Sequence, residues 1–550
     1  MGTGDCLAPL PLPADLRRRR LRIIVPSFPA FNIYSSIARI TTALGPVSVA
    51  TVVNKMTGWD AEVIDENNYR RHGPVDGTGR PDYDVLQKLR PADVIGLYGG
   101  LTSTIPRLHE LAARFRREGI PVIAGGQHFT GDNIRDAIDH GVGTIVLGEG
   151  EITAQELLAA LVAGRDPAGI PGVAFLRDGR VVQTPSRAPV TEFAQLPCPD
   201  FSLVRHARIS LFPIGWVRGC GMNCEFCTVK GKVRFPTPEH AIDQIVTHFE
   251  RHNARHFFIV DDLFGQRRED AIRFCRMLRD YQRTTRVRFD ITVQIRLDKS
   301  KDTELLHAMR EAGIHMLAIG FESPIPEELA AMNKKVKPED MVAMARVYHK
   351  AGFLVHGMFI FGYPVLPGVD FSMSADERVR RFRKFIKQAR IDTVQILLPV
   401  PLPGTEMTER LARENRIFPR DEIGWEYYDG NFPLFVPDAP LRPEDMQASS
   451  HLIMGRFYRF KYMFAIGIRV LVFPAILFSL HNIKSGWRQW YRHWRNNLWR
   501  FGGWLILRKW TSEFKKGDFS GKLARAKGHV GKADAPGTTP SLSAGIPTRP

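Results

Sequence analysis

The sequence has little cysteine, and no long apolar run follows its basic amino-terminal segment. Six of 550 residues are cysteine, which is too few for a disulfide framework of the kind that small secreted proteins use. Residues 1–20 therefore do not resemble a signal peptide. We expect a cytoplasmic protein with reduced thiols, which suit metal or redox chemistry better than bridging.

Acidic residues are scarce near the carboxyl end. Residues 451–516 contain 13 Lys and Arg and one acid, Glu513, within a chain of formal charge +18. Residues 470–480 are apolar, but a membrane-spanning helix needs about 20 such residues. A helical apolar face follows, flanked by arginines, and together they predict an interfacial helix on an anionic bilayer. The face comprises Trp487, Trp490, Trp494, Leu498, Phe501 and Leu505, and the arginines are Arg488, Arg492 and Arg495. A helix packed on the rest of the protein is the open alternative.

Residues 21–165 alternate between short apolar runs and helical patterns. We expect strands at 21–28, 60–67, 92–99, 121–128 and 143–150, with helices such as 45–56 and 103–119 between them. Five strands joined by crossovers predict an α/β fold, an open doubly wound parallel sheet of the flavodoxin-like kind. Ligands of such sheets lie beyond the carboxyl ends of the strands.

A second series of alternating elements begins near residue 211. Its six expected strands are 213–219, 256–262, 287–296, 315–323, 353–362 and 392–401. Six such units predict a partial (β/α)6 barrel, with its chemistry at the carboxyl ends of the strands. The predicted division of the chain is an extension (1–20), the doubly wound domain (21–165), a linker (166–210), the barrel (211–403), a mostly helical region (404–516) and a disordered tail (517–550).

Three of the six cysteines lie within the segment RGCGMNCEFCTVKG, just after the first expected barrel strand. Cys220, Cys224 and Cys227 have C-x3-C-x2-C spacing. A four-iron cluster has four corners, so three thiolates leave one iron open to a substrate or cofactor. A zinc site completed by Cys198 or His206 is an alternative, although zinc sites usually contain paired C-x2-C units. Unconnected surface thiols are a third interpretation.

The cysteine spacing, the aromatic Phe226 before the third cysteine and the six-fold barrel together resemble the radical S-adenosylmethionine (SAM) superfamily. The resemblance implies a [4Fe–4S] cluster whose open iron is chelated by SAM. One electron from the cluster then cleaves SAM to a 5′-deoxyadenosyl radical, which abstracts hydrogen from the substrate.

The resemblance also implies SAM contacts at the ends of the barrel strands. Asp261 and Asp262 end the second strand, where this chain has Asp-Asp-Leu-Phe instead of the family's common Gly-Gly-Glu. The expected cofactor-binding residues are Phe226, Asp262, Gln294, Arg296, Glu322 and Ser323.

A doubly wound domain ahead of such a barrel resembles the cobalamin-binding subclass. Three segments carry the likeness: 42–50, 125–128 and 146–151. The resemblance implies cobalamin contacts by Leu44, Gly45, Ser48, Gly125, Gly126, His128, Gly148 and Glu149. The D-x-H-x-x-G motif that supplies a lower cobalt ligand in many cobalamin proteins is absent, and His128 is the nearest candidate for that ligand.

The two cofactors imply methyl transfer from methylcobalamin to a substrate radical, with no protein residue assigned a catalytic role. We expect a small apolar substrate such as a lipid, an isoprenoid or a porphyrin, and an external electron donor of the flavodoxin or ferredoxin type. We expect no nucleic acid partner, and peripheral contact with the inner face of the membrane. Oxidative cyclisation is the alternative reaction, and a basic RNA- or membrane-binding protein with a structural metal is the alternative of another class.

Overall fold

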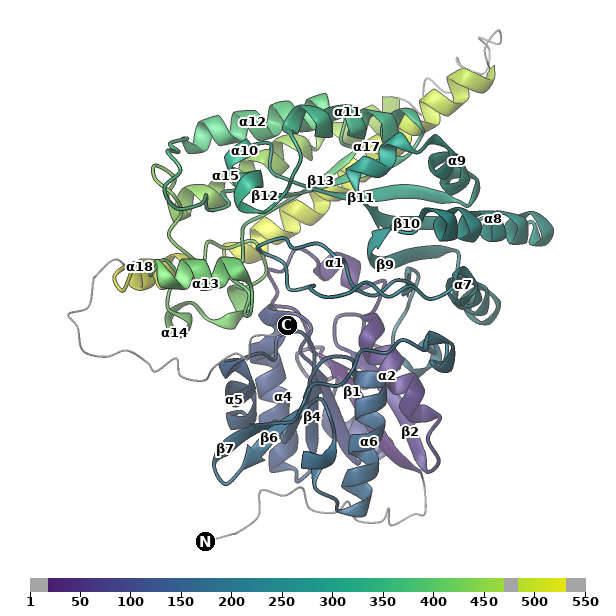
Figure 1. Cartoon of the computed structure of the whole chain (residues 1–550), viewed down its shortest axis with the longest axis vertical. Helices are drawn as coiled ribbons and strands as arrows, with labels where there is room; N and C mark the ends of the chain where they lie inside the picture. Colours follow the sequence, from purple (N-terminus) through teal and green to yellow (C-terminus); the bar gives the residue numbers. More distant parts are fainter. Residues whose placement is uncertain (1–17, 469–482, 531–550) are drawn as a thin grey trace.

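The protein forms two α/β units that lie one above the other in the view of Figure 1. The computed structural model describes residues 18–468 and 483–530. The amino-terminal unit is built on a seven-stranded sheet and the second unit on a six-stranded sheet. The carboxyl-terminal helices cover one side of the second unit.

The first sheet has the strand order β2-β1-β3-β4-β5-β6-β7, and its first five strands are parallel. This is the predicted flavodoxin-like arrangement. The strands are β1 (Arg19–Val25), β2 (Trp59–Asp65), β3 (Val94–Tyr98), β4 (Val122–Gly125) and β5 (Thr144–Val146). The helices are α1 (Ser35–Ala38), α2 (Leu44–Asn54), α3 (Tyr83–Leu89), α4 (Ile105–Arg117), α5 (Asp132–Asp139) and α6 (Gly150–Ala163).

The sheet continues beyond β5 as an antiparallel hairpin, β6 (Val173–Arg177) and β7 (Arg180–Gln183). These two strands were not predicted, because residues 166–210 were expected to form a linker. The hairpin turns at Asp178 and Gly179, which both have positive φ, 49° and 73°. An Asp-Gly turn of this kind joins hairpin strands without splaying them.

The second sheet consists of six parallel strands in consecutive order, from β8 to β13. The prediction of a partial (β/α)6 barrel is confirmed. The strands are β8 (Phe212–Ile214), β9 (His256–Phe264), β10 (Asp290–Ile295), β11 (Ile314–Glu322), β12 (Leu354–Ile360) and β13 (Thr393–Leu397). The helices are α7 (Pro238–His252), α8 (Arg268–Thr285), α9 (Thr303–Glu311), α10 (Pro326–Ala331), α11 (Pro338–Lys350) and α12 (Ala375–Gln388).

Local sequence explains where many of these helices begin. Proline occupies the first turn of α4, α7, α10 and α11, where its missing N–H has no helical partner to lose. Side chains cap others: Asp82 accepts from the first turn of α3, and Ser374 accepts from Glu377 in α12. α6 ends at Gly164, which adopts the left-handed conformation.

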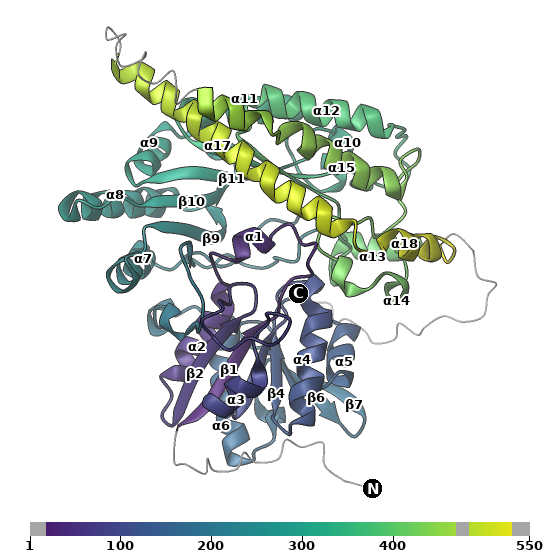
Figure 2. The same ribbon diagram turned by 180° about the vertical axis from the view of Figure 1, so that it is seen from behind.

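The carboxyl-terminal region is helical, as predicted, and packs on the barrel. Its helices are α13 (Glu406–Arg413), α14 (Arg420–Ile423), α15 (Pro443–Phe457), α17 (Ile483–Phe514) and α18 (Phe519–Lys527). α15 packs on α12 and β13, and α17 packs on α15. Figure 2 shows α17 running diagonally across this side of the molecule.

Two expectations for this region need correction. The prediction of disorder from residue 517 is wrong for α18, where Phe519, Leu523 and Ala526 are buried against α14 and the 427–434 segment. In α17 the face that docks on α15 and on the residues just before β13 also differs from the predicted apolar face. It runs through Asn496, Arg500, Gly503, Leu507 and Trp510.

The predicted apolar face of α17 is only partly covered. Leu498 is 46% exposed and Leu505 49% exposed, whereas the placement of the Trp487 side chain and of residues 470–480 lies outside what the structure describes. Within residues 18–468 and 483–530, none of the helices combines the length and the hydrophobicity needed to cross a bilayer.

Candidate active site

The three cysteines lie on a loop that closes on itself immediately after β8. Arg218 and Arg234 exchange two backbone hydrogen bonds, N to O distances of 3.2 and 3.0 Å, across the neck of the loop. Gly219 and Gly221 sit in the neck with φ of 90° and 70°. A Cβ on Gly221 would lie 2.8 Å from the Val233 side chain, so a larger residue at this turn would displace the opposite strand of the loop.

All three thiols are partly exposed and free of disulfides. Cys227 N donates to Cys224 O at 3.2 Å, which makes a tight turn between these two cysteines. Lys230 Nζ donates to Cys224 O at 2.8 Å, and Gln266 Nε2 donates to Cys220 O at 3.1 Å. The three thiols therefore lie on one short, hydrogen-bonded loop, and this donor set suits three irons of a cubane while leaving the fourth iron without a protein ligand.

The two residues considered as a fourth zinc ligand are engaged elsewhere. Cys198 Sγ lies 3.9 Å from His248 Nε2 of α7. The ring of His206 packs against Tyr69 and His72 in the amino-terminal unit. Neither arrangement directs a ligand atom to the cysteine loop, which argues against the zinc interpretation.

The residue between Cys224 and Phe226 is a buried carboxylate that ties the loop to the carboxyl-terminal region. Glu225 is 7% exposed. Arg410 of α13 binds both of its oxygens, at 2.7 and 3.0 Å, and Tyr363 Oη donates to Glu225 Oε2 at 2.6 Å. Because the charge is paired and fully hydrogen-bonded, its burial is tolerated, and the backbone on both sides of Glu225 is held in place.

One of the predicted SAM contacts, Asp262, lies near the end of β9, and another, Phe226, lies on the cysteine loop. The Phe226 ring packs edge-on against Tyr363, with 6.0 Å between centroids. Burial raises the pKa of Asp262 above its usual value, and burial also raises that of the neighbouring Asp261 to about 7. Asp261 Oδ1 accepts from Trp216 N at 2.7 Å, so Asp261 supports the backbone and leaves Asp262 to face the site.

Gln294, Arg296 and Glu322 lie at the carboxyl ends of the next two strands. Gln294 Nε2 reaches Asp261 O at 3.4 Å. Arg296 Nη1 lies 2.9 Å from the Met222 sulfur on the cysteine loop. Glu322 has φ of 60°, a strained value for a residue with a side chain, and strain of this kind concentrates at functional sites.

The predicted SAM contact at Ser323 does not fit the structure. Ser323 is fully buried, and its hydroxyl donates to Glu328, which pairs with Arg378. The same hydroxyl accepts from Ile325 N at 3.1 Å. Ser323 therefore shapes the turn after β11 and presents no free polar group to a ligand.

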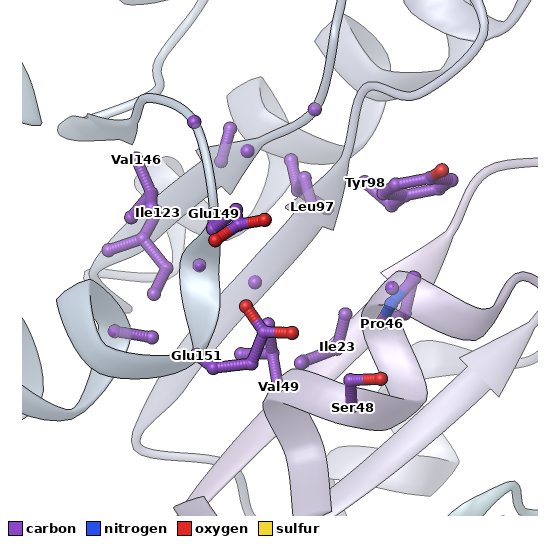
Figure 3. Close-up of a pocket in the computed structure, with 18 of the residues that line it drawn as sticks. Ile23, Pro46, Ser48, Val49, Leu97, Tyr98, Ile123, Val146, Glu149 and Glu151 are labelled. Carbon is purple, nitrogen blue, oxygen red and sulfur yellow. The ribbon is translucent and has the colours of Figure 1, made fainter. Parts of the chain in front are cut away.

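A cavity of about 320 Å³ lies at the carboxyl edge of the first sheet. Ile23, Leu97, Ile123 and Val146 form its floor, while Glu149, Glu151, Ser48 and Tyr98 lie around it (Figure 3). The lining includes seven of the eight residues expected to bind cobalamin: Leu44, Gly45, Ser48, Gly125, Gly126, Gly148 and Glu149. The structure brings these residues together, and their role in cofactor binding stays a prediction.

Glu149 connects this cavity to the cysteine loop. Arg234 binds its two carboxylate oxygens at 2.6 and 2.9 Å, and Arg218 Nη1 lies 3.2 Å from Oε1. Burial raises the pKa of Glu149, but the hydrogen bond from Arg234 and the charge of Arg218 outweigh it and lower the pKa overall. Arg218 also pairs with Glu151 at 2.6 Å. The neck of the cysteine loop is thus bound to the wall of the cavity.

His128 does not lie on the cavity. Its ring is 3% exposed, with Nδ1 3.3 Å from Thr102 Oγ1 and its edge against Trp425 at a centroid distance of 4.9 Å. Burial, with a smaller contribution from His109, lowers the pKa of His128 to about 4. These contacts favour a role in packing the Gly-Gly-Gln-His turn and argue against an axial cobalt ligand.

His109, Asp136 and His140 gather close enough to be considered as metal ligands. The rings of His109 and His140 are stacked, with centroids 3.9 Å apart and planes 7° from parallel. A metal ion lies in the plane of each imidazole that binds it, so two rings stacked in this way cannot share one ion. We assign no metal to this cluster.

Several residues that organise the site were not predicted from the sequence. Arg218 and Arg234 border the cysteine motif, Arg410 and Tyr363 are remote from it in sequence, and Lys334 pairs with Glu322 at 3.1 Å. Their charge is visible in the sequence, but their partners are up to 185 residues away. The position of Lys334 after the fourth barrel strand, in the connection between α10 and α11, was the one signal that could have drawn attention to it.

The barrel matches a known protein family. Residues 214–373 match the family model of the Radical SAM superfamily. This segment contains the cysteine loop, so the protein carries a radical SAM domain and is an enzyme of that class. Such a domain implies a [4Fe–4S] cluster and SAM, and the resemblance drawn from the sequence is confirmed at this level.

Among curated proteins, the chain is similar to an uncharacterized methyltransferase of Pyrococcus horikoshii, 27% identical over 62% of this chain and 74% of that protein. It is similar to the hopanoid C-2 methylase of Rhodopseudomonas palustris, 27% identical over 48% of this chain and 52% of that protein. It is also similar to the anaerobic magnesium-protoporphyrin IX monomethyl ester cyclase of Cereibacter sphaeroides, 23% identical over 58% of this chain and 51% of that protein.

Among solved structures, the fold is similar to the radical SAM methyltransferase TsrM of Kitasatospora setae with cobalamin and a [4Fe–4S] cluster bound. The TM-score is 0.59 with 19% identity, over 72% of this chain and 78% of TsrM. It is also similar to the cobalamin-dependent radical SAM enzyme OxsB with aqua-cobalamin bound, with a TM-score of 0.60 and 14% identity over 94% of this chain and 84% of OxsB. The likeness extends over both units of the fold.

Proposed function

We propose that the protein is a cobalamin-dependent radical SAM enzyme that transfers a methyl group to a carbon of an apolar substrate. The observation that carries the proposal is the bidentate ion pair between Glu149 and Arg234. It joins the wall of the first cavity to the neck of the loop that holds the three cysteines. Two cofactors that exchange reactive groups need adjoining sites of this kind.

The cavity suits part of a corrinoid. Its walls are aliphatic side chains and glycine backbone, with Ser48 and Glu151 as polar groups at the rim. A whole corrinoid is larger than 320 Å³, so the cavity would receive one portion of it while the rest faced the barrel. When bound, cobalamin supplies a transferable methyl group, and the protein contributes position and exclusion of water.

The names of the relatives support methyl transfer to an apolar substrate, because they include a methyltransferase and a hopanoid methylase. The similarity to a protoporphyrin ester cyclase supports oxidative cyclisation as the runner-up. Both reactions use a substrate radical and an electron donor of the flavodoxin or ferredoxin type. They differ in the product, because methylation adds one CH2 unit to the mass and oxidative cyclisation does not.

The exposed side of the carboxyl-terminal helices supports peripheral membrane contact, at the inner face of the cytoplasmic membrane. Trp499 is 50% exposed and Leu505 is 49% exposed on α17, while Phe464 and Ile468 are 59% and 60% exposed nearby. Arg495, Arg508 and Lys509 of α17 add positive charge. Apolar side chains bordered by cations match the surface of an anionic bilayer, where an apolar substrate would be found.

The cluster is tested by anaerobic reconstitution with iron and sulfide. The parent chain should gain the charge-transfer absorbance of a [4Fe–4S] cluster, and Cys224→Ala should lose it. Cys198→Ala is the matched control because this cysteine lies beside His248, and it should assemble the cluster normally. Absorbance that is absent from the parent, or unchanged in Cys224→Ala, would favour the basic binding protein with a structural metal.

Cobalamin is tested by purification with hydroxocobalamin, which should leave about one corrinoid per parent chain. Gly45→Leu should reduce the retained corrinoid at least tenfold, since a Cβ at Gly45 meets only Tyr98, at 3.9 Å, and the side chain would extend into the cavity. Gly77→Leu, in an exposed loop with no atoms near the new Cβ, is the control. Equal retention in both variants would refute the cavity as the cobalamin site.

Membrane contact is tested by flotation with vesicles that contain anionic lipid. Leu505→Glu should lower the fraction of protein bound to vesicles severalfold. Leu89→Glu should not lower it, because Leu89, although 68% exposed, lies on α3 of the amino-terminal unit. Equal flotation of both variants would refute the membrane surface.

The reaction itself is tested by comparing the metabolites of a deletion strain with those of its parent. A mass difference of one CH2 between substrate and product supports methylation.

A further inference from the structure

Lys334 is a cation placed against the cysteine loop, in the connection between α10 and α11. Its side chain is 27% exposed, and Nζ lies 3.1 Å from Glu322 Oε1 at the end of β11. The next residue, Lys335, is exposed to solvent. Two adjacent lysines therefore differ in environment, and one of them faces the site.

The position of Lys334 is fixed by its neighbour. Asn333 Nδ2 donates to Asn223 O at 2.9 Å, and Asn223 directly precedes Cys224. Asn333 has φ of 60°, so the chain turns sharply here. This contact fastens the lysine segment to the cysteine loop independently of the Glu322 ion pair.

The ammonium of Lys334 lies close enough to the sulfurs of Cys220 and Cys224 for a direct charge interaction with each. The carboxylate of Asp262 lies within the same range of Cys220, and that of Glu322 within the same range of Cys224. The hydrogen bond from Asn333 to Asn223 and the ion pair with Glu322 hold the ammonium beside these two cysteines.

The same geometry bears on electron transfer to the cluster. A [4Fe–4S]²⁺ core with three thiolates carries a net negative charge, and adding one electron makes the charge more negative. A fixed ammonium nearby stabilises the reduced form more than the oxidised form, and local charge and hydrogen bonding are among the factors that set the potential of such clusters. Partial burial strengthens the effect, because water screens it less.

We propose that Lys334 is a positioning residue whose charge raises the reduction potential of the cluster, and that the charge of Glu322 lowers this potential. One electron from an external low-potential donor of the flavodoxin or ferredoxin class converts [4Fe–4S]²⁺ to [4Fe–4S]⁺, and no proton moves because the ammonium stays charged. The inference rests on the radical SAM cluster of the proposed function. It does not depend on cobalamin, on the substrate or on methyl transfer.

The test is an anaerobic redox titration of the reconstituted full-length chain without SAM, monitored by the electron paramagnetic resonance signal of the reduced cluster. Lys334→Gln should make the one-electron reduction at least tenfold less favourable, which is a fall of about 59 mV in midpoint potential. Lys334→Arg should restore the parent value because it keeps the charge, and Lys335→Gln should match the parent. Glu322→Gln should shift the potential upward, which gives a second variant of opposite sign.

The outcomes separate this inference from the proposed function. Iron and sulfide content per chain are measured first, and a parent without a cluster would overturn both. A parent with a cluster whose potential is unchanged in both Lys334→Gln and Glu322→Gln would overturn the inference alone. Weaker SAM binding by Lys334→Gln at an unchanged potential would also overturn it, by making Lys334 a ligand of the SAM carboxylate.

Discussion

Arg234 holds Glu149 by two parallel hydrogen bonds, Nη2 to Oε1 at 2.6 Å and Nη1 to Oε2 at 2.9 Å. Glu149 immediately precedes α6 in the first unit, and Arg234 lies at the neck of the cysteine loop in the second. A bidentate guanidinium–carboxylate pair fixes direction as well as distance. The two units are therefore joined at the place where the cavity and the cysteine loop meet.

Glu149→Gln should loosen this junction. We expect a loss of about 1 to 3 kcal/mol in stability, because Arg234 and Arg218 would be left with a weaker, neutral acceptor in a partly buried place. Amide hydrogen exchange in residues 219–233 should accelerate as the neck of the loop opens. Glu156→Gln on the outer side of α6 is the control, since Glu156 is 44% exposed in its pair with Arg187. Equal exchange in the two variants would contradict the role of Glu149.

Glu225→Gln should release the other side of the cysteine loop. Breaking a buried ion pair by neutralising one partner typically costs about 3 to 5 kcal/mol, because the remaining charge is left buried. Arg410 would be left in this state, and we expect a lower melting temperature and less iron bound per chain after reconstitution. Glu377→Gln removes an exposed helical pair with Arg381 and should have little effect. Equal iron content in Glu225→Gln and Glu377→Gln would show that Glu225 does not anchor the cysteine loop.

His128 should make the stability of the first unit sensitive to acid. Its folded pKa of about 4 lies below the ordinary value of 6.5, so the unfolded chain takes up the proton first. The contribution of His128 to the free energy of unfolding is fully present above pH 6.5 and is lost as the pH falls towards 4. The loss is about 3 kcal/mol in total, of which about 2 kcal/mol has occurred by pH 5. The charged and titratable groups that face it are His109, Asp136 and Arg420.

His128→Gln should therefore show a smaller drop in apparent melting temperature between pH 7.5 and pH 5.0 than the parent. Glutamine keeps a polar group for Thr102 and does not titrate. His307→Gln serves as the control because the His307 side chain is 77% exposed. If His128→Gln and His307→Gln have the same pH dependence as the parent, His128 is not the source of the acid sensitivity.

The sequence was sufficient to predict the two sheets and the cysteine loop because their signals are local. Apolar runs at regular spacing predict strands, and Cys220, Cys224 and Cys227 lie within eight positions. The hairpin of β6 and β7 was not predicted although Asp178-Gly179 is a hairpin signal, and residues 166–210 were expected to form a linker. Seven of the eight residues expected to bind cobalamin line one cavity because the first two turns of α2, the end of β4 and the loop after β5 meet at the same edge of the sheet.

The remaining errors concern contacts between distant parts of the chain. Ser323 follows a barrel strand as a ligand would, but the burial of its hydroxyl beside Glu328 depends on Arg378 of α12. The docking face of α17 is set by the shape of the barrel edge, where Asn496 Nδ2 donates to Asp392 Oδ1 at 2.6 Å. Composition misled the prediction for α18, where Phe519, Leu523 and Ala526 have helical spacing within a segment rich in Gly, Ala and Lys.

Leu523→Ala tests whether α18 belongs to the folded protein. Leu523 is 5% exposed in a cluster with Tyr427, Phe432 and Phe519, so its truncation should cost about 2 to 4 kcal/mol. Phe31 of the first unit stacks on Tyr427 at a centroid distance of 5.1 Å, and protection of the 427–434 segment in hydrogen exchange should fall as well. Leu498→Ala on the exposed side of α17 should cost less than about 0.5 kcal/mol. If the Leu523→Ala variant is as stable as Leu498→Ala, α18 is not part of the folded protein, and the disordered tail expected from composition is correct.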